Sequence, residues 1–144
     1  MPILPHLYRL YLSRGYLPLV GLSPTAFGAF PLATYTWLLQ DGKSFTQGLG
    51  ISMQELYFFE CLFEVLKPAR VFAIGNSFGW STLALSLLNP QAKVVAIDAG
   101  YDVNSVEGID LTNAIAQENG LNCKVVQKVS PADVPAVIGQ EFDG

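Results

Sequence analysis

Short apolar runs recur along the second half of the chain. Residues 70–75, 93–98 and 124–129 are such runs, with few polar residues between their hydrophobic positions. Strands of a parallel sheet are covered on both faces, so they have this continuous apolar character instead of a regular alternation with polar residues. The pattern predicts three buried strands.

A helix is expected before the first of these strands. Ser52 and Glu55 form an S-x-x-E capping box, in which two side chains satisfy amides that a helix start leaves free. Apolar residues then repeat at helical spacing, namely Leu56, Phe59, Phe63 and Leu66. Pro68 ends the helix.

Three more helices are expected between and after the strands. Leucines share one face of residues 82–88, and a further helix lies near residues 110–119 with Gly120 as its C-cap. Ser130 and Pro131 are a suitable N-cap and first-turn pair for a last short helix. The apolar face of that helix consists of Val134, Val137 and Ile138.

Strands and helices therefore alternate, which implies a parallel sheet with right-handed crossovers. We expect an α/β fold, a Rossmann-like doubly wound sheet in three α/β/α layers. The strand order 3-2-1 would leave residues 71–74 as an exposed apolar edge. We accordingly expect a fold truncated after its third strand, a fragment whose substrate half is missing. The alternatives are that another chain or the N-terminal arm covers this edge.

Residues 1–50 are dense in Pro, Gly, Tyr and Phe and show neither a sustained helical nor a sustained strand period. They are expected to form an irregular apolar arm. Such an arm can cover a substrate pocket, pack on a partner subunit of a homo-oligomer, or close one side of the core.

Composition narrows the class of protein. The 144 residues are 51% hydrophobic and 14% charged, against about 25% charged in typical domains. This is one domain at most, and Cys61 and Cys123 are expected to be free, buried thiols in a reducing cytoplasm. Eight Lys and Arg residues and a net charge of −4 disfavour a nucleic-acid partner.

The stretch from Gly15 to Gln40 carries no formal charge and is long enough to suggest a membrane span. Pro18, Pro24 and Pro31 would break a spanning helix repeatedly. We therefore expect a soluble, cytoplasmic protein that does not bind membranes.

The turn after the first strand, residues 75–82, has the first candidate chemistry. Gly75 lets the backbone bend sharply out of the strand, and Gly79 removes a side chain where the next helix approaches the sheet. Free amides at that helix start would bind a carboxylate or phosphate oxygen. The candidate hydroxyl donors beside them are Ser77, Ser81 and Thr82.

Asp98, at the end of the second strand, is the second candidate. Ligands of doubly wound sheets bind outside the carboxyl ends of the strands, where a carboxylate can accept both hydroxyls of a ribose. The alternative is that Asp98 only caps its strand and that Gly75 and Gly79 serve packing. We favour a nucleoside cofactor because both features occur where such a cofactor needs them together.

Spacing separates the candidate cofactors. A dinucleotide fingerprint starting at Gly75 would need glycine in place of Ser77 and Trp80, and a tryptophan would prevent the close helix–strand packing. NAD is therefore disfavoured. A Walker loop is absent as well, because no Gly-Lys-Ser/Thr follows.

Residues 71–83 resemble the first motif of class I S-adenosylmethionine-dependent methyltransferases, in particular the small O-methyltransferase-like group. Residues 94–98 look like the ribose-binding strand end of that family, and residues 142–144 look like the start of its fourth strand. The resemblance covers residues 51–144, which it identifies as the N-terminal half of a cofactor-binding Rossmann-like domain. It implies S-adenosylmethionine as cofactor, a small-molecule methyl acceptor, and most simply O-methylation.

The resemblance also implies which residues bind the cofactor. These residues are Gly75, Asn76, Ser77, Gly79, Trp80 and Ser81 around the methionine part, Asp98 on the ribose, and Ala99 and Ser130 beside the adenine. The ring of Trp80 or Phe78 would either face the sulfonium or lie in the core. Two departures from the family pattern are Ala73 in place of an acidic residue and Ser77 in place of the middle glycine.

No catalytic base is assigned, since His6, the only histidine, lies in the arm and is expected to be an ordinary solvated or capping residue. No metal site is expected either, because metal-dependent O-methyltransferases place their ligands on and after the fourth strand. Two other functions stay open. One is a noncatalytic or decayed module used for assembly, and the other is a nucleotide-binding oxidoreductase domain.

Overall fold

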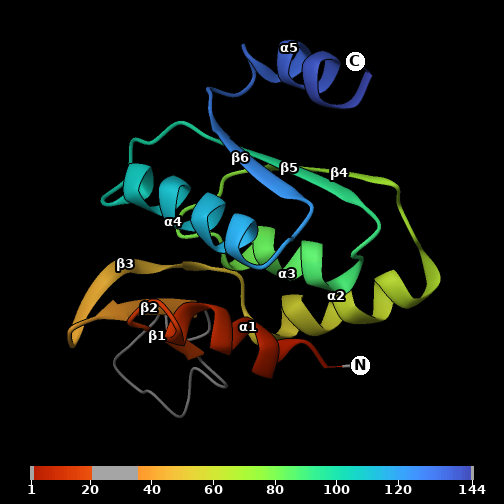
Figure 1. Ribbon diagram of the computed structural model, residues 1–144. Coiled ribbons are helices and arrows are strands. Elements are labelled where there is room, and N and C mark those ends of the chain that lie inside the picture. Colours follow the sequence, from red (N-terminus) through yellow and green to blue (C-terminus); the bar gives the residue numbers. More distant parts are fainter. Residues whose placement is uncertain (1, 21–35, 144) are drawn as a thin grey trace.

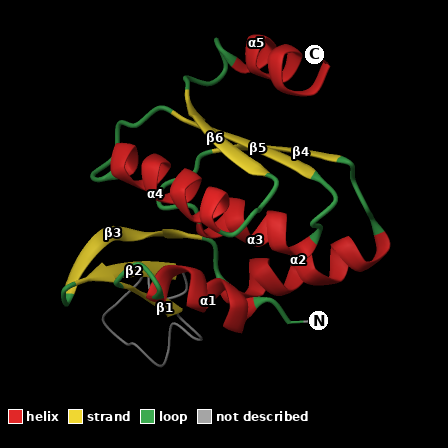
Figure 2. Cartoon of the chain, in the orientation of Figure 1, coloured by secondary structure: helices red, strands yellow, loops and turns green. Residues whose placement is uncertain are grey.

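The computed structural model describes residues 2–20 and 36–143. The helices are α1 (Leu4–Leu12), α2 (Met53–Val65), α3 (Trp80–Leu88), α4 (Ser105–Glu118), α5 (Val134–Ile138) and a π-helical turn, η2 (Gly139–Asp143). The strands are β1 (Tyr16–Val20), β2 (Thr36–Gln40), β3 (Lys43–Gly50), β4 (Arg70–Ile74), β5 (Lys93–Asp98) and β6 (Cys123–Gln127). They form two separate three-stranded sheets (Figure 2).

The second sheet is parallel, with the order β4-β5-β6. Helices α2, α3 and α4 lie along one face of this sheet, and α5 lies on the other (Figure 1). Side chains of β5 alternate accordingly, because Val95 and Ile97 pack with Val137 of α5, whereas Ala96 packs with Ile109 of α4. The expected Rossmann-like, doubly wound α/β fold is confirmed for this part of the chain.

The helix before this sheet begins as the sequence predicts. The Ser52 amide donates to Glu55 Oε2 at 2.8 Å, and the Glu55 amide donates to Ser52 Oγ at 3.2 Å. Together these bonds form the capping box. The helix ends before Pro68, and β4 begins shortly after it, at Arg70.

Two of the other predicted helix starts are wrong. Helix α4 begins at Ser105, five residues before the predicted start near Asp110, because Asn104 takes a left-handed conformation (φ 59°) that turns the chain into the helix. Helix α5 has Asp133 as its N-cap instead of Ser130. Pro135 fits in the first turn of α5, because an amide there has no helical partner to lose.

The N-terminal fifty residues are not irregular where the structure describes them. They contain α1 and an antiparallel sheet of order β1-β2-β3. Asp41 and Gly42, with φ values of 52° and 74°, form the tight turn between β2 and β3. A two-residue turn with both φ values positive matches the twist of a hairpin, and Asp-Gly is its favoured sequence.

Helix α1 belongs to the same core as the helices that cover the parallel sheet. Leu7, Leu10 and Tyr11 of α1 are buried in one cluster with Phe78 and Leu83. The arm therefore closes one side of the core. The other two predicted roles of the arm, covering a pocket and packing on a partner subunit, depend partly on residues 21–35. These lie outside the described residues. Among the described helices, none has both the length and the apolar character needed to cross a bilayer.

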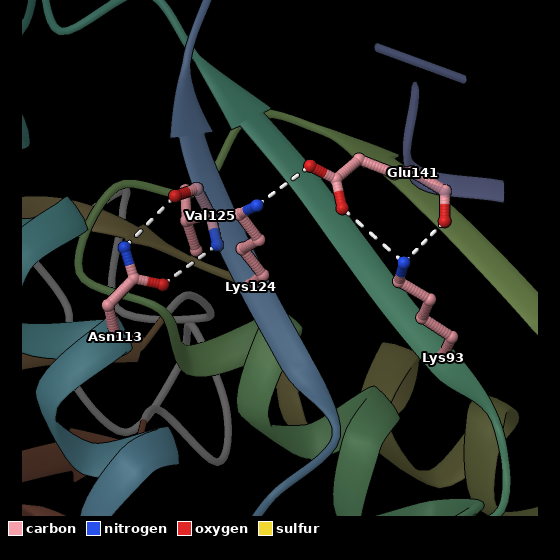
Figure 3. Close-up of polar contacts among 5 residues, drawn as sticks. All are labelled: Lys93, Asn113, Lys124, Val125 and Glu141. Atoms are coloured by element: carbon pink, nitrogen blue, oxygen red, sulfur yellow. Dashed lines mark hydrogen bonds and ion pairs between the residues drawn. The ribbon is translucent and has the colours of Figure 1, made fainter. Parts of the chain in front are cut away.

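The two edges of the parallel sheet differ. On β6, the side-chain amide of Asn113 donates to the Val125 carbonyl at 2.9 Å and accepts from its amide at 2.8 Å, so it replaces a neighbouring strand there (Figure 3). Within the described residues β4 pairs only with β5, and Ile74 is 62% exposed. The expected exposed edge is present.

The segment after α5 continues as a π-helical turn and does not start a strand as the resemblance suggests. Side chains hold it against the sheet. The carboxylate of Glu141 lies between Lys124 at 2.8 Å and Lys93 at 3.4 Å, and Lys93 also donates to the Glu141 carbonyl (Figure 3). Phe142 packs edge-on against Phe72, with 6.4 Å between ring centroids.

Candidate functional site

The turn after β4 and the end of β5 meet at the carboxyl edge of the parallel sheet. We call residues 75–79 the glycine loop. Its Asn76 and Ser77 amides donate to Asp98 Oδ2 at 2.8 and 2.9 Å, and the Gly75 amide donates to the Ile97 carbonyl at 2.8 Å. The two predicted features of the site are therefore brought together by direct hydrogen bonds.

The glycine loop has three residues with positive φ, namely Gly75 at 93°, Ser77 at 50° and Gly79 at 95°. A Cβ on Gly75 would meet nothing within 4 Å, so this glycine faces open space at the edge of the sheet. A Cβ on Gly79 would lie only 2.1 Å from Thr112 Oγ1, so this glycine serves close packing against α4. Gly79 therefore permits close packing, as the sequence predicts, but its neighbour is α4 and not the sheet.

The side chain of Asn76 points into the protein and holds the loop from within. It is buried, donates to Thr112 Oγ1 at 3.0 Å and to the Ser77 carbonyl at 3.1 Å, and accepts from Thr82 Oγ1 at 2.8 Å. A buried polar group with all these partners stabilises one conformation. Asn76 can therefore offer a ligand only its backbone carbonyl, because its amide already donates to Asp98. Thr82 is held in the same network.

Ser77 replaces the middle glycine and takes the left-handed conformation that a glycine would take. Its carbonyl approaches α4 so closely that a Cβ on Gly108 would lie 2.0 Å from it. The buried Ser77 Oγ has no hydrogen-bond partner among the described residues. An unsatisfied buried hydroxyl is costly, and because this Oγ is shielded from solvent, a ligand could bond to it only after the loop moved.

Asp98 has limited capacity for further hydrogen bonds. Its Oδ2 accepts two amides of the glycine loop, and its Oδ1 accepts the Gly100 amide at 2.8 Å. An ionised carboxylate offers about four acceptor positions. One position on Oδ1 therefore remains, so a ribose that uses both hydroxyls must displace one of these three amides from the carboxylate.

The aromatic residues of the turn lie in the core. Trp80 is 1% exposed and Phe78 is fully buried. Tyr8 and Tyr11 of α1 pack on the indole, with centroid separations of 6.0 and 5.7 Å. The expectation of a core aromatic is therefore correct, and neither ring lies at the surface where a sulfonium would bind. What Trp80 offers a ligand is its backbone at the start of α3.

The other predicted residues surround the same edge less closely. Ser81 is half-buried in the first turn of α3, and Ala99 is half-buried directly after β5. Ser130 is exposed after β6, before Pro131. Ala73, which replaces the acidic residue of the family, packs among Ala96, Ile109 and Val125 instead of facing the turn.

The sequence did not identify three residues that are distant in the chain but contact the glycine loop, namely Gly108, Thr112 and Tyr11. Gly108 and Thr112 lie one turn apart on α4 and face the loop. A glycine in a helix interior is a signal of close packing that could have identified Gly108. No local signal identifies Tyr11, because its contact spans 67 residues.

No metal site is evident near this edge. In residues 2–20 and 36–143, no three His, Cys, Asp or Glu side chains are grouped closely enough to hold an ion. His6 is exposed on α1 and lines a cavity with Glu60, Phe63 and Leu87, residues of α2 and α3.

No protein-family model and no curated protein matches the sequence. Among solved structures, cofactor-bound Rv0187 from MTB is similar, with 23% identity and a TM-score of 0.52 over 65% of this chain and 42% of that one. A SAM-dependent methyltransferase from Agrobacterium tumefaciens is 10% identical, with a TM-score of 0.49 over 74% of this chain and 34% of that one. Coclaurine N-methyltransferase bound to N-methylheliamine and SAH is 18% identical, with a TM-score of 0.43 over 54% of this chain and 22% of that one.

The likeness to Rv0187 shows the fold alone, and the other two add nothing to it at these TM-scores. The chain spans 42% of the length of Rv0187. The parallel sheet and its helices therefore form part of a Rossmann-like α/β fold, in which the glycine loop and Asp98 meet at one edge.

Proposed function

We propose that this chain binds S-adenosylmethionine at the glycine loop and Asp98, and that it provides the cofactor-binding part of a class I methyltransferase. The acceptor would be a small molecule, and O-methylation is the reaction that the sequence resemblance favours. The observation that carries the proposal is the contact between Asp98 and the amides of Asn76 and Ser77, at 2.8 and 2.9 Å. It joins two neighbouring strand ends where doubly wound folds bind nucleosides.

The residues at this edge fit such a cofactor in two ways. Gly75 faces open space, and Asp98 Oδ1 has one remaining acceptor position. The amino acid part would lie along the loop and the start of α3, and the ribose would bind Asp98. Ala99 and Ser130 would border the adenine, where Tyr101 and Val129 also expose apolar surface.

Bound S-adenosylmethionine supplies an electrophilic methyl group on its sulfonium. The contribution of this chain is to hold the donor in one orientation, because in-line displacement depends on the alignment of the reacting atoms. The network around Asn76 fixes the glycine loop before the cofactor binds. Preorganisation of this kind lowers the cost of binding.

The two alternative functions make different demands on the same residues. A dinucleotide cofactor needs a third glycine at the position of Trp80, which instead fills the core between α1 and α3. A decayed module would have no use for a preorganised loop, although the replacements at Ala73 and Ser77 favour that function. Titration with NADH and with S-adenosylhomocysteine separates the three: the proposed function requires binding of the second ligand alone.

The decisive variant is Asp98→Asn, with Asp110→Asn on the exposed face of α4 as the matched control. We expect S-adenosylhomocysteine to bind the unaltered chain and the control equally in calorimetry. Asp98→Asn should weaken binding by about tenfold or more, because a charged hydrogen bond to ribose contributes about 1.5–3 kcal/mol. Binding that is unchanged in Asp98→Asn, or absent from the unaltered chain, contradicts the proposal.

A further inference from the structure

Helix α1 forms a hydrogen bond to the glycine loop through the buried hydroxyl of Tyr11. Tyr11 is fully buried, and its Oη donates to the Phe78 carbonyl at 2.8 Å. Its ring packs edge-on against Phe78, with 6.1 Å between centroids, and tilted against Trp80 at 5.7 Å. The contact links residues 67 positions apart in the sequence.

The peptide group between Phe78 and Gly79 connects the glycine loop to the start of α3 and is hydrogen-bonded at both its carbonyl and its amide. Its carbonyl accepts from Tyr11, and its amide donates to the Asn76 carbonyl at 2.8 Å. Gly79 then accepts the first hydrogen bond of α3, from the Leu83 amide at 2.9 Å. Rotation of this peptide would change the loop that precedes it and the direction of the first amides of α3.

We propose that Tyr11 is a positioning residue for cofactor binding, whose hydroxyl fixes the Phe78–Gly79 peptide and thereby the conformation of the glycine loop. The effect on cofactor binding rests on the proposed function, whereas the hydrogen bond from Tyr11 to the Phe78 carbonyl does not. The N-terminal arm then has a role at the site without touching the cofactor. Other supports of the loop come from β5 and α4, through Asp98 and Thr112.

The chemistry of Tyr11 suits a constant support. Burial raises the pKa of its phenol well above the usual value of 10.0. The hydroxyl therefore stays protonated, and stays a donor, at neutral pH. The contact does not act as a pH switch.

The alternative is that Tyr11 only fills space in the core. Tyr11→Phe separates the two roles because it keeps the ring and removes the hydroxyl. Tyr8→Phe is the matched control, since Tyr8 lies on the same helix and packs on Trp80 at 6.0 Å. Both variants should fold, and thermal unfolding establishes the temperature range in which binding can be compared.

Two measurements test the proposal on the full chain. Hydrogen exchange by NMR should show at least about fivefold faster exchange of the Gly79 amide in Tyr11→Phe, with sheet amides such as Ile97 unchanged. Calorimetry with S-adenosylhomocysteine should show binding weakened by about fivefold. Tyr8→Phe should leave both quantities within about twofold of the unaltered chain.

The outcomes distinguish the positioning role from the proposed function. Unchanged Gly79 exchange in Tyr11→Phe overturns the inference, and so does faster exchange with unchanged affinity. Failure of the unaltered chain to bind S-adenosylhomocysteine contradicts the proposed function, and with it the effect of Tyr11 on cofactor affinity. In that case Gly79 exchange still decides whether Tyr11 fixes the loop.

Discussion

At the scale of single residues, two glycines with positive φ, Gly79 in the glycine loop and Gly120 after α4, differ in what surrounds them. Gly79 combines a φ of 95° with a wall formed by Thr112, whereas Gly120 at the end of α4 has a φ of 64° and open space around it. A left-handed conformation costs an L-residue about 1–2 kcal/mol. A clash in a packed interior costs about 1–3 kcal/mol in addition.

This pair of glycines gives the first residue-scale prediction. Gly79→Ala should lower the free energy of unfolding by about 2–5 kcal/mol, and Gly120→Ala by about 1–2 kcal/mol. Urea unfolding of both variants measures the difference. Equal losses would show that Thr112 yields without cost and that Gly79 is not held against α4.

The same scale shows where sequence reasoning ends. The glycines at 75 and 79 and the acidic strand end at Asp98 were predicted from position along the chain, because those features are local. The buried side chain of Asn76 was not, because its partner Thr112 lies 36 residues away. The hydrogen bonds that occupy Asp98 were likewise invisible, since they depend on how the loop folds back onto β5.

At the scale of elements, the C-terminal turn η2 is held to the sheet by charge. Glu141, whose side chain is 10% exposed, lies between Lys124 and Lys93 (Figure 3). The hydrogen bond from Lys124, with a further contribution from Lys93, lowers the pKa of Glu141 below its usual 4.5. A carboxyl group whose folded pKa is lowered stabilises the fold above its unfolded pKa, and that stabilisation is lost as the pH falls through the folded pKa.

Glu141→Gln tests this linkage. At neutral pH the variant should be less stable by about 0.5–1 kcal/mol, a small value because both lysines are partly solvated. The difference should shrink as the pH falls below the usual glutamate pKa of 4.5 and should vanish once the pH is below the lowered pKa of Glu141, since the unaltered chain then protonates Glu141 as well. Thermal unfolding across this range provides the measurement, and a difference that persists at low pH would exclude the ionic contact as its cause.

The helix and strands of the N-terminal part were not predicted, because elements this short do not produce a sustained hydrophobic period. Helix α1 has one buried face of Leu7, Leu10 and Tyr11, which is only two turns long. Asp41-Gly42 between apolar runs is the strongest short-range signal of a hairpin, and it correctly marks the β2–β3 turn. Density in Pro and Gly indicated irregular structure, but these residues punctuate short strands equally well.

At the scale of the whole molecule, two parts of the chain meet at one loop. The parallel sheet presents Asp98 and the glycine loop, while α1 reaches the same loop through Tyr11. At the edge of β6, Asn113 satisfies the backbone of Val125, and β4 is open on one side among the described residues (Figures 1 and 3). The proposed cofactor site therefore rests on supports from both parts of the fold.

The most direct test of the central claim is an NMR titration of the isotope-labelled chain with S-adenosylhomocysteine. The proposed site predicts that amide shifts change at residues 75–81 and 98–100, and that they change little at the opposite end of the sheet, around Lys93. A titration that leaves the glycine loop and Asp98 unperturbed, or that perturbs only residues distant from them, would contradict the assignment of this edge as the cofactor site.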